Sequence, residues 1–220
     1  MIQPATLKFL AKLEKNNDRS WFEANRPAWE NVKEAFIQFT DELVKTIAQF
    51  DPPIGELQAK QCIFRINRDV RFSKDKRPYK NHVSAYFNKG GKKANGAGYY
   101  VHIEPGRCFA AAGIWMPPPA DLARIRQEID YNFEEWRSLL ENKNFKKQIP
   151  AGLESTEKLV RPPKGYTEDD PAIEYLKMKS FIASRSFTDE EVTTPGFLQK
   201  VGKMLEATKP LSDFLNRALD

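Results

Sequence analysis

The sequence of 220 residues predicts an α+β fold in one domain, residues 1–220, with a mostly antiparallel sheet packed against two long amphipathic helices. Three observations support this prediction. Two long segments repeat apolar side chains every three or four residues, and several shorter segments alternate apolar and polar side chains. The connections between these shorter segments are too short for the crossovers that parallel strands require. No linker long enough to separate two independent domains is visible.

The first 50 residues predict two helices. Leucines recur at helical spacing from Leu7 to Leu13, after the candidate N-cap Thr6, so we expect a short helix that ends at Asn16. A second, longer helix follows Pro27. Its apolar stripe consists of Trp29, Val32, Phe36, Phe39, Leu43, Ile47 and Phe50. The prolines at 52 and 53 end this helix, and its continuous stripe predicts a core face.

Four segments with the alternation of β-strands follow. They are Cys62–Asn67, His82–Phe87, Tyr99–Glu104 and Cys108–Trp115. Pro105-Gly106 predicts a tight hairpin between the last two. Between the second and third strands lies a glycine-rich stretch, Asn88–Gly98, which we interpret as a mobile hairpin connection over the site. It lacks the Gly-Lys-Ser or Gly-Lys-Thr pattern of a phosphate loop that joins a strand to a helix.

The second half of the chain predicts a further covering helix and then a long connection. This helix begins at Asp121 and repeats apolar side chains to Leu140. Residues 141–170 are polar and predict a surface connection with little regular structure. The remaining expected elements are a short helix Pro171–Met178, a strand Lys179–Phe187, and a final helix that Thr194-Pro195 opens and Lys209-Pro210 breaks.

The composition predicts a cytoplasmic protein. No apolar run approaches the roughly 20 residues that span a bilayer, so we expect no membrane partner. The first four residues, Met1–Pro4, lack the basic and apolar regions of an export signal. The only cysteines, Cys62 and Cys108, make neither a disulfide framework nor a structural zinc site. A reducing compartment is the simplest environment for such a chain.

The positive charge is concentrated in one segment. Lys and Arg exceed Asp and Glu by five over the whole chain, yet residues 60–82 alone carry eight basic and two acidic residues. A protein that coats a long duplex usually carries basic residues along several elements, because its affinity grows with the number of neutralised phosphates. One dense island instead predicts the binding of a compact anionic group.

We expect Arg65, Arg68 and Arg71 to hold this anion, because the planar guanidinium pairs two oxygens at once. Their three-residue spacing would scatter them over both faces of a strand, so the chain is expected to leave the sheet near Arg68. Further candidate anion ligands are Lys74, Lys80 and Arg185. The alternative is a solvated turn in which Asp69 and Asp75 form exposed ion pairs of little energetic value.

The only two histidines, His82 and His102, fall on a strand face that holds other polar side chains. That face also carries Ser84, Tyr86, Tyr100 and Glu104. Imidazole, phenol and carboxyl groups beside arginines can transfer protons to a bound anion, so we predict that His82 or His102 moves a proton and Tyr100 orients the ligand. The alternative is that both histidines are hydrogen-bonded within a half-buried sheet. His82, His102 and Glu104 reach only the minimum of metal ligands, and we predict no metal or other cofactor.

The sequence also resembles a family of bacterial and fungal proteins grouped as domain of unknown function 2461. The matching residues are Trp21-Phe22, Phe64-Arg65-Ile66, Arg68-Asp69, Arg71–Lys76, Pro78-Tyr79-Lys80, Gly98-Tyr99-Tyr100 with His102, Gly113 with Trp115-Met116-Pro117, Pro163-Lys164-Gly165, and Lys179-Ser180-Phe181 through Arg185. The resemblance covers nearly the whole chain. It implies a single compact unit in a cytoplasmic protein, and it implies no particular reaction.

These observations predict a pocket for a phosphorylated or carboxylated small molecule, and they leave open whether a bond is broken in it. A second hypothesis is a nucleic-acid binding module in which Tyr79, Tyr86 and Tyr100 stack on bases beside the basic segment. A third is a protein-interaction or structural role, in which the basic segment meets an acidic partner. The sequence does not indicate the identity of a substrate or an oligomeric state.

Overall fold

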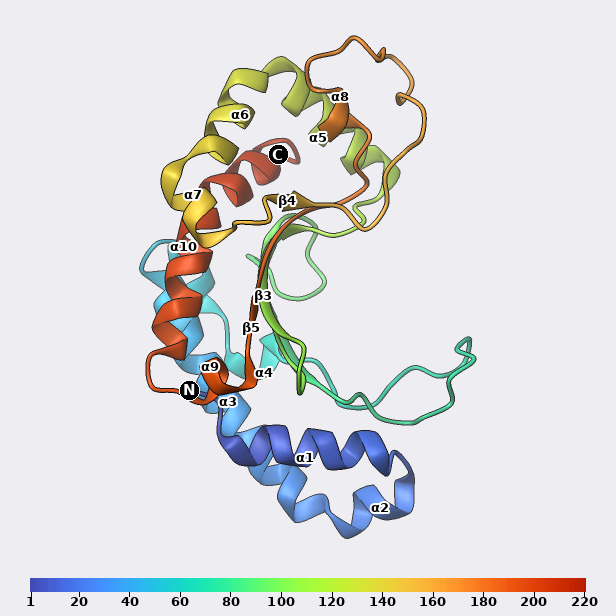
Figure 1. The fold of residues 1–220 in the computed structure, drawn as a ribbon, viewed down its shortest axis with the longest axis vertical. Helices are drawn as coiled ribbons and strands as arrows, with labels where there is room; N and C mark the ends of the chain where they lie inside the picture. The colour runs from blue at the N-terminus through green and yellow to red at the C-terminus, as the bar shows by residue number, and fades with distance from the viewer. The chain divides into compact units, whose positions relative to one another are not determined.

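The computed structural model describes every residue from Met1 to Asp220 (Figure 1). It contains one antiparallel sheet of five strands in the order β1-β2-β3-β5-β4. The strands are β1 Val83–Phe87, β2 Gly98–Ile103, β3 Cys108–Ile114, β4 Leu153–Glu154 and β5 Phe181–Phe187. The predicted α+β class and antiparallel sheet are therefore confirmed. None of the helices combines the length and the apolar character that a bilayer span requires.

Contacts within the chain divide it into two compact units. Unit 1 consists of Met1–Lys92, Tyr100–Ala110 and Ser186–Gly202. Unit 2 consists of Lys93–Tyr99, Ala111–Arg185 and Lys203–Asp220. The strands of the sheet contribute residues to both units. That the chain folds as one domain stays a prediction.

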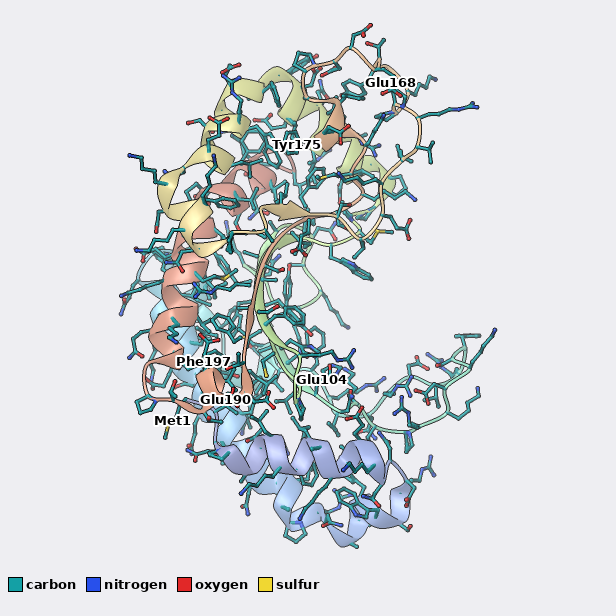
Figure 2. All side chains as sticks on the ribbon, in the orientation of Figure 1. Met1, Glu104, Glu168, Tyr175, Glu190 and Phe197 are labelled. Carbon is teal, nitrogen blue, oxygen red and sulfur yellow. The ribbon has the colours of Figure 1, made fainter.

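Unit 1 is built around helix α3. Its helices are α1 Pro4–Lys15, α2 Arg19–Ala24, α3 Arg26–Ala48, the 3₁₀ helix η1 Pro52–Glu56, α4 Ala59–Cys62 and α9 Asp189–Thr193. One expected long helix is present as α3, which contacts α1, α4, η1 and β1, whereas a sheet packed against two long helices is not confirmed. Phe197, which is labelled in Figure 2, stacks on Phe39 with ring centroids 5.6 Å apart and meets Phe187 at 5.3 Å. These buried rings form the core beside the strands.

Unit 2 is built around a buried tryptophan. Its helices are α5 Pro119–Tyr131, α6 Phe133–Glu141, α7 Lys143–Gln148, α8 Ile173–Leu176 and the part of α10 Phe197–Arg217 that follows Gly202. Trp136 is fully buried, and its ring contacts Phe181, Phe214 and Tyr175, of which Tyr175 is labelled in Figure 2. Aromatic pairs of this kind stabilise the fold by more than the burial of their apolar area alone.

The helices differ from the predictions at several places. The first begins at Pro4, two residues before the predicted cap Thr6, because proline fits the first helical turn. The predicted helix 121–140 is interrupted at Asn132, whose backbone leaves the helical region. The predicted connection 141–170 contains α7, capped by the Asn142 side chain, and strand β4. Helix α9, with a capping box formed by Thr188 and Glu191, was missed. The final helix starts at Phe197 instead of Thr194-Pro195.

The prediction that Lys209-Pro210 breaks the final helix is wrong. Helix α10 continues through Pro210 to Arg217. Pro210 is exposed, and so is Glu206, whose carbonyl loses its helical partner and can bond to water instead. Beyond the proline, Leu211, Phe214 and Leu215 are buried. Continued burial of this apolar stripe offsets the roughly 3 kcal/mol that a proline costs inside a helix.

The predicted strand Cys62–Asn67 is also wrong. Cys62 ends helix α4, and only two isolated bridges follow, Ile63 with Ala85 and Asn67 with Tyr79. The Arg68 amide donates to the Pro78 carbonyl at 2.9 Å, and the Lys80 amide donates to the Ile66 carbonyl at 2.8 Å. The chain therefore folds back on itself between Asn67 and Tyr79 and projects away from the sheet as a loop (Figure 1). We call residues 67–79 the basic loop.

Candidate anion-binding site

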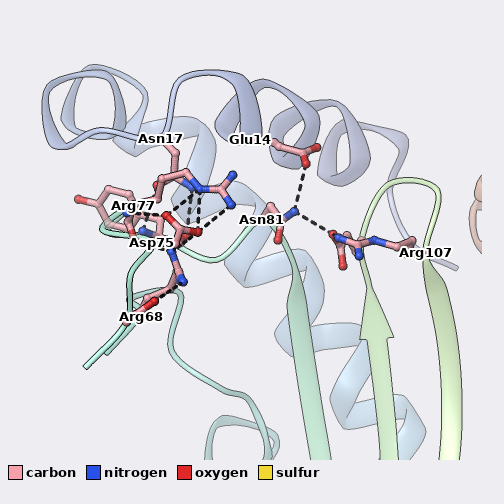
Figure 3. Close-up of polar contacts among 10 residues, drawn as sticks. Glu14, Asn17, Arg68, Asp75, Arg77, Asn81 and Arg107 are labelled. Atoms are coloured by element: carbon pink, nitrogen blue, oxygen red, sulfur yellow. Dashed lines mark hydrogen bonds and ion pairs between the residues drawn. The ribbon is translucent and has the colours of Figure 1, made fainter. Parts of the chain in front are cut away.

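The base of the basic loop is fixed to the connection between α1 and α2, as Figure 3 shows. The Asn17 side chain accepts from the Tyr79 amide and donates to the Tyr79 carbonyl, both at 3.0 Å. The Tyr79 ring is buried and stacks on Phe22 with centroids 4.0 Å apart. Because this ring is already covered, Tyr79 does not offer a surface on which a base could stack. The nucleic-acid hypothesis stays a prediction, and it loses Tyr79 as a residue on which a base could stack.

All three arginines of the basic loop pair with the loop's own aspartates. The Arg71 guanidinium bonds to Asp69 through Nε at 3.0 Å and Nη2 at 2.6 Å. Arg77 and Arg68 both bond to Asp75, each at 2.8 Å (Figure 3). The hydrogen bonds from Arg71 lower the pKa of Asp69, and those from Arg77 lower the pKa of Asp75. The predicted anion ligands Arg68 and Arg71 thus already hold carboxylates and do not contact the histidines.

Three other cations lie near one another, and none of them forms an ion pair with an acid. They are Arg65, Lys80 and Lys92, which we call the cation cluster. The Lys80 and Lys92 ammonium groups lie 5.3 and 5.4 Å from the centre of the Phe64 ring, and Lys92 also donates to the Ile63 carbonyl. Burial, followed by the charges of Arg65 and Lys92, lowers the pKa of Lys80. Arg65 influences the pKa of Asp69 at longer range but forms no ion pair.

A hydrogen-bonded series of side chains runs along β2 and the residue that follows it. The Tyr100 hydroxyl lies 3.0 Å from His102 Nδ1, and His102 Nε2 lies 2.9 Å from Glu104 Oε2. His102 is 8% exposed and Glu104 6%. These residues share one face because side chains two apart in a strand point the same way. The predicted association of Tyr100, His102 and Glu104 is therefore present in the structure.

Two further residues hold Glu104 ionised. The Asn81 amide donates to Glu104 Oε1 at 2.8 Å, and the Arg107 guanidinium pairs with the same oxygen (Figure 3). Burial raises the pKa of Glu104, but the bonds from His102 and Arg107 outweigh burial and lower it overall. This carboxylate therefore accepts hydrogen bonds on both of its oxygens.

The second histidine stacks beside the first. His82 directly precedes β1, and its ring centre lies 4.2 Å from that of His102. Burial, followed by the charge of His102 and then of Lys80, lowers the pKa of His82 to about 4. Burial also lowers the pKa of His102, in spite of the neighbouring carboxylate. Both rings are thus predominantly neutral at pH 7.

The cation cluster and the β2 side chains are neighbours within unit 1. The Phe64 ring meets the Tyr100 ring at 6.3 Å, and the charge of Lys80 lowers the pKa of both histidines. Of the predicted residues, the structure therefore brings together Arg65, Lys80, His82, Tyr100 and His102. This arrangement places positive charge and titratable groups in one neighbourhood, as anion binding with proton transfer requires.

The remaining predicted residues lie elsewhere or take other roles. Lys74 is exposed on the basic loop. Arg185 belongs to unit 2, where its guanidinium donates to Gln148 Oε1 at 2.8 Å. Ser84 is buried and hydrogen-bonds to Tyr100, while Tyr86 accepts from the Asn88 amide at 3.2 Å.

Sequence reasoning missed four residues of the site. They are Phe64, Asn81, Lys92 and Arg107. Arg107 could have been found, because it follows Glu104 by three residues across the predicted hairpin. For Lys92 the sequence showed only a lysine that follows two glycines. Its position in the site depends on a loop that brings it back to Ile63.

Comparisons with known proteins find one matching family. The family described as conserved hypothetical protein DUF2461 matches residues 5–214. The match covers nearly the whole chain and includes every residue of the cation cluster and of the β2 series. No curated protein and no solved structure matches the chain.

Proposed function

We propose that this chain, which belongs to the DUF2461 family of conserved hypothetical proteins, binds the phosphate group of a small molecule at the cation cluster. The observation that carries the proposal is that Lys80 and Lys92 face one ring and that the charge of Arg65 acts on Lys80, while none of the three forms an ion pair with a carboxylate. Bringing like charges together in a partly desolvated place costs free energy. A bound anion would remove that cost.

A phosphate group suits the cluster better than a carboxylate does. A phosphate ester carries up to two negative charges and three free oxygens, whereas a carboxylate carries one charge and two oxygens. The cluster offers one guanidinium fork and two ammonium groups, which can pair with all three oxygens. The organic part of the ligand would then lie near Phe64, whose side chain is partly exposed at 37%.

The β2 side chains supply a means of moving a proton beside this anion. With Glu104 ionised, His102 donates from Nε2 to the carboxylate, and its Nδ1 accepts from the Tyr100 hydroxyl. A hydroxyl bonded to an imidazole that a carboxylate orients is the arrangement that activates hydroxyl groups in many enzymes. The Tyr100 ring meets the Phe64 ring that the Lys80 ammonium faces, so a ligand held by Lys80 would lie beside Tyr100.

Isothermal titration calorimetry with phenyl phosphate tests the proposal. We expect saturable binding by the wild type and a loss of at least about tenfold in affinity for Arg65→Ala, because one charge-assisted pair is removed. Arg71→Ala is the matched control, since Arg71 is an exposed arginine already paired with Asp69. No saturable binding by the wild type, or equal losses in the two variants, would contradict a site at the cation cluster.

A further inference from the structure

We infer that His82, His102 and Glu104 form a binding site for a divalent transition-metal ion of the Zn²⁺ type. One possible ligand atom from each of the three side chains lies within 4.8 Å of the other two. Ligand atoms around one tetrahedral ion lie about 3.3 Å apart, because each is roughly 2 Å from the ion, so the three atoms lie near one another but not yet at bound separations. Small rotations of the side chains would bring all three into contact with a single ion.

The kinds of ligand atom indicate which ion the site would take. Two imidazole nitrogens and one carboxylate oxygen suit zinc and similar first-row metals, whereas calcium and magnesium prefer oxygen ligands. Three protein ligands also leave a coordination position open. An open fourth position is typical of zinc sites that bind water or substrate, while structural sites are closed by four protein ligands.

The surroundings hold two of the ligands in the orientation that a metal requires. His102 Nε2 faces the Glu104 carboxylate, and its other nitrogen meets the Tyr100 hydroxyl at 3.0 Å. Glu104 Oε1 is held by Asn81 and Arg107, which leaves Oε2 to face the ring. Histidines that bind metal usually donate their second N–H to a neighbouring acceptor. With a metal at Nε2, the His102 tautomer reverses and Nδ1–H donates to Tyr100.

His82 provides the second, independent observation. It is half-buried, and its ring lies 4.2 Å from that of His102. The fully buried polar side-chain atoms without a partner are Trp136 Nε1 and Ser212 Oγ, so the His82 nitrogens remain within reach of water. An ion that enters from solvent can therefore reach His82 beside the pair of His102 and Glu104.

The nearby positive charges couple this metal site to anion binding. Lys80 and Arg107 act electrostatically on both histidines and would weaken the binding of a free cation. A phosphate held at the cation cluster would offset that repulsion, and one of its oxygens could fill the open coordination position. Resting on the function proposed above, the inference therefore includes a mutual increase in affinity between metal and phosphate, since coupling of this kind is reciprocal.

Equilibrium dialysis of the whole chain against Zn²⁺ tests the site. We expect about one ion per chain for the wild type, in line with a three-ligand site, and at least about a tenfold weaker affinity for His82→Ala and for Glu104→Gln. His82→Ala removes no hydrogen bond, so the variant should fold, which circular dichroism would verify. Absorption by bound Co²⁺ in the visible range would report the coordination geometry.

Arg65→Ala separates this inference from the proposed function. We expect this variant to bind Zn²⁺ like the wild type in phosphate-free buffer but to lose the increase caused by phenyl phosphate. Zn²⁺ binding by a chain that binds no phosphate would support the metal site and contradict only the proposed function. Absence of Zn²⁺ binding at micromolar concentration, or binding unchanged in both His82→Ala and Glu104→Gln, would overturn the metal site while leaving the anion site standing.

Discussion

The basic loop and the cation cluster contain the same kinds of residue but treat charge in opposite ways. In the loop, Arg71 and Arg77 each bond to an aspartate two residues earlier in the chain. The cation cluster instead brings Lys80 and Lys92 to the Phe64 ring and the charge of Arg65 close to Lys80, with no ion pair to an acid. The comparison teaches that a high density of basic residues in the sequence does not itself locate a site. Cations that tertiary structure brings together without a counter-charge are the better indicator.

Charge reversal should give the largest difference between the two regions. Lys80→Glu places a carboxylate against the bound phosphate, so we expect at least about a hundredfold loss of affinity for phenyl phosphate, because attraction becomes repulsion at short range. Arg71→Glu, on the exposed loop, should change the affinity by less than about threefold because water and salt screen it. Calorimetry at fixed ionic strength measures both. Similar losses would show that the charge of the whole basic segment is responsible, as expected for a nucleic-acid surface.

Neutralising one carboxylate beside the histidines and one in the basic loop should change the free energy of unfolding by different amounts. Glu104→Gln weakens buried hydrogen bonds to His102, Asn81 and Arg107, and we expect it to lower the free energy of unfolding by about 2 kcal/mol. Asp69→Asn breaks an ion pair with an arginine whose side chain is 76% exposed, and should lower the free energy of unfolding far less. Guanidinium denaturation followed by fluorescence gives both values. A larger cost for Asp69→Asn would reverse the comparison.

Acid should break the ion pairs of the basic loop by protonating its aspartates. Hydrogen bonds from Arg71 and Arg77 lower the pKa values of Asp69 and Asp75 below their usual value of 3.8. A lowered pKa in the folded state means that each pair contributes above the unfolded pKa and is lost as the pH falls through the folded one. We therefore expect the loop pairs to persist at pH 5 and to break only below 3.8. NMR titration of the two carboxyl carbons measures this, and a midpoint above 3.8 would mean that the pairs do not form.

Two phenylalanines should show the smallest effects. Phe72, at the loop, is 95% exposed, so we expect Phe72→Leu to change stability by less than about 0.5 kcal/mol and phosphate affinity not at all. Phe64→Leu removes the ring that both lysines face, and we expect it to weaken phosphate binding about threefold as the lysines lose a cation–π contact. Calorimetry compares the variants. A larger loss of phosphate affinity for Phe72→Leu than for Phe64→Leu would contradict a site at the cation cluster and indicate one at the basic loop.

The alternation of apolar and polar residues and the turn residues predicted the elements that depend on neighbouring residues in the sequence. The alternation from Tyr99 to Glu104 and the turn at Gly106 gave the hairpin and placed Tyr100, His102 and Glu104 on one face. The basic loop was anticipated only in part, because the pairing of Arg68 with Asp75 depends on how the chain turns between Asn67 and Tyr79. The cation cluster was the least predictable feature. Lys92 reaches it by contact with Ile63, 29 positions earlier, and nothing in either local sequence records that contact.

The spacing of the loop pairs has a consequence for how this segment can change. Asp69 with Arg71, and Asp75 with Arg77, are each contained within three consecutive residues and pair through their own hydrogen bonds. Residues inserted or deleted at Ser73 or Lys74 would leave both short pairs intact, and would disturb the longer pair of Arg68 with Asp75 and the bond from the Lys76 ammonium to the Val70 carbonyl. The two halves of the tip therefore keep most of their own charge compensation when the length between them changes.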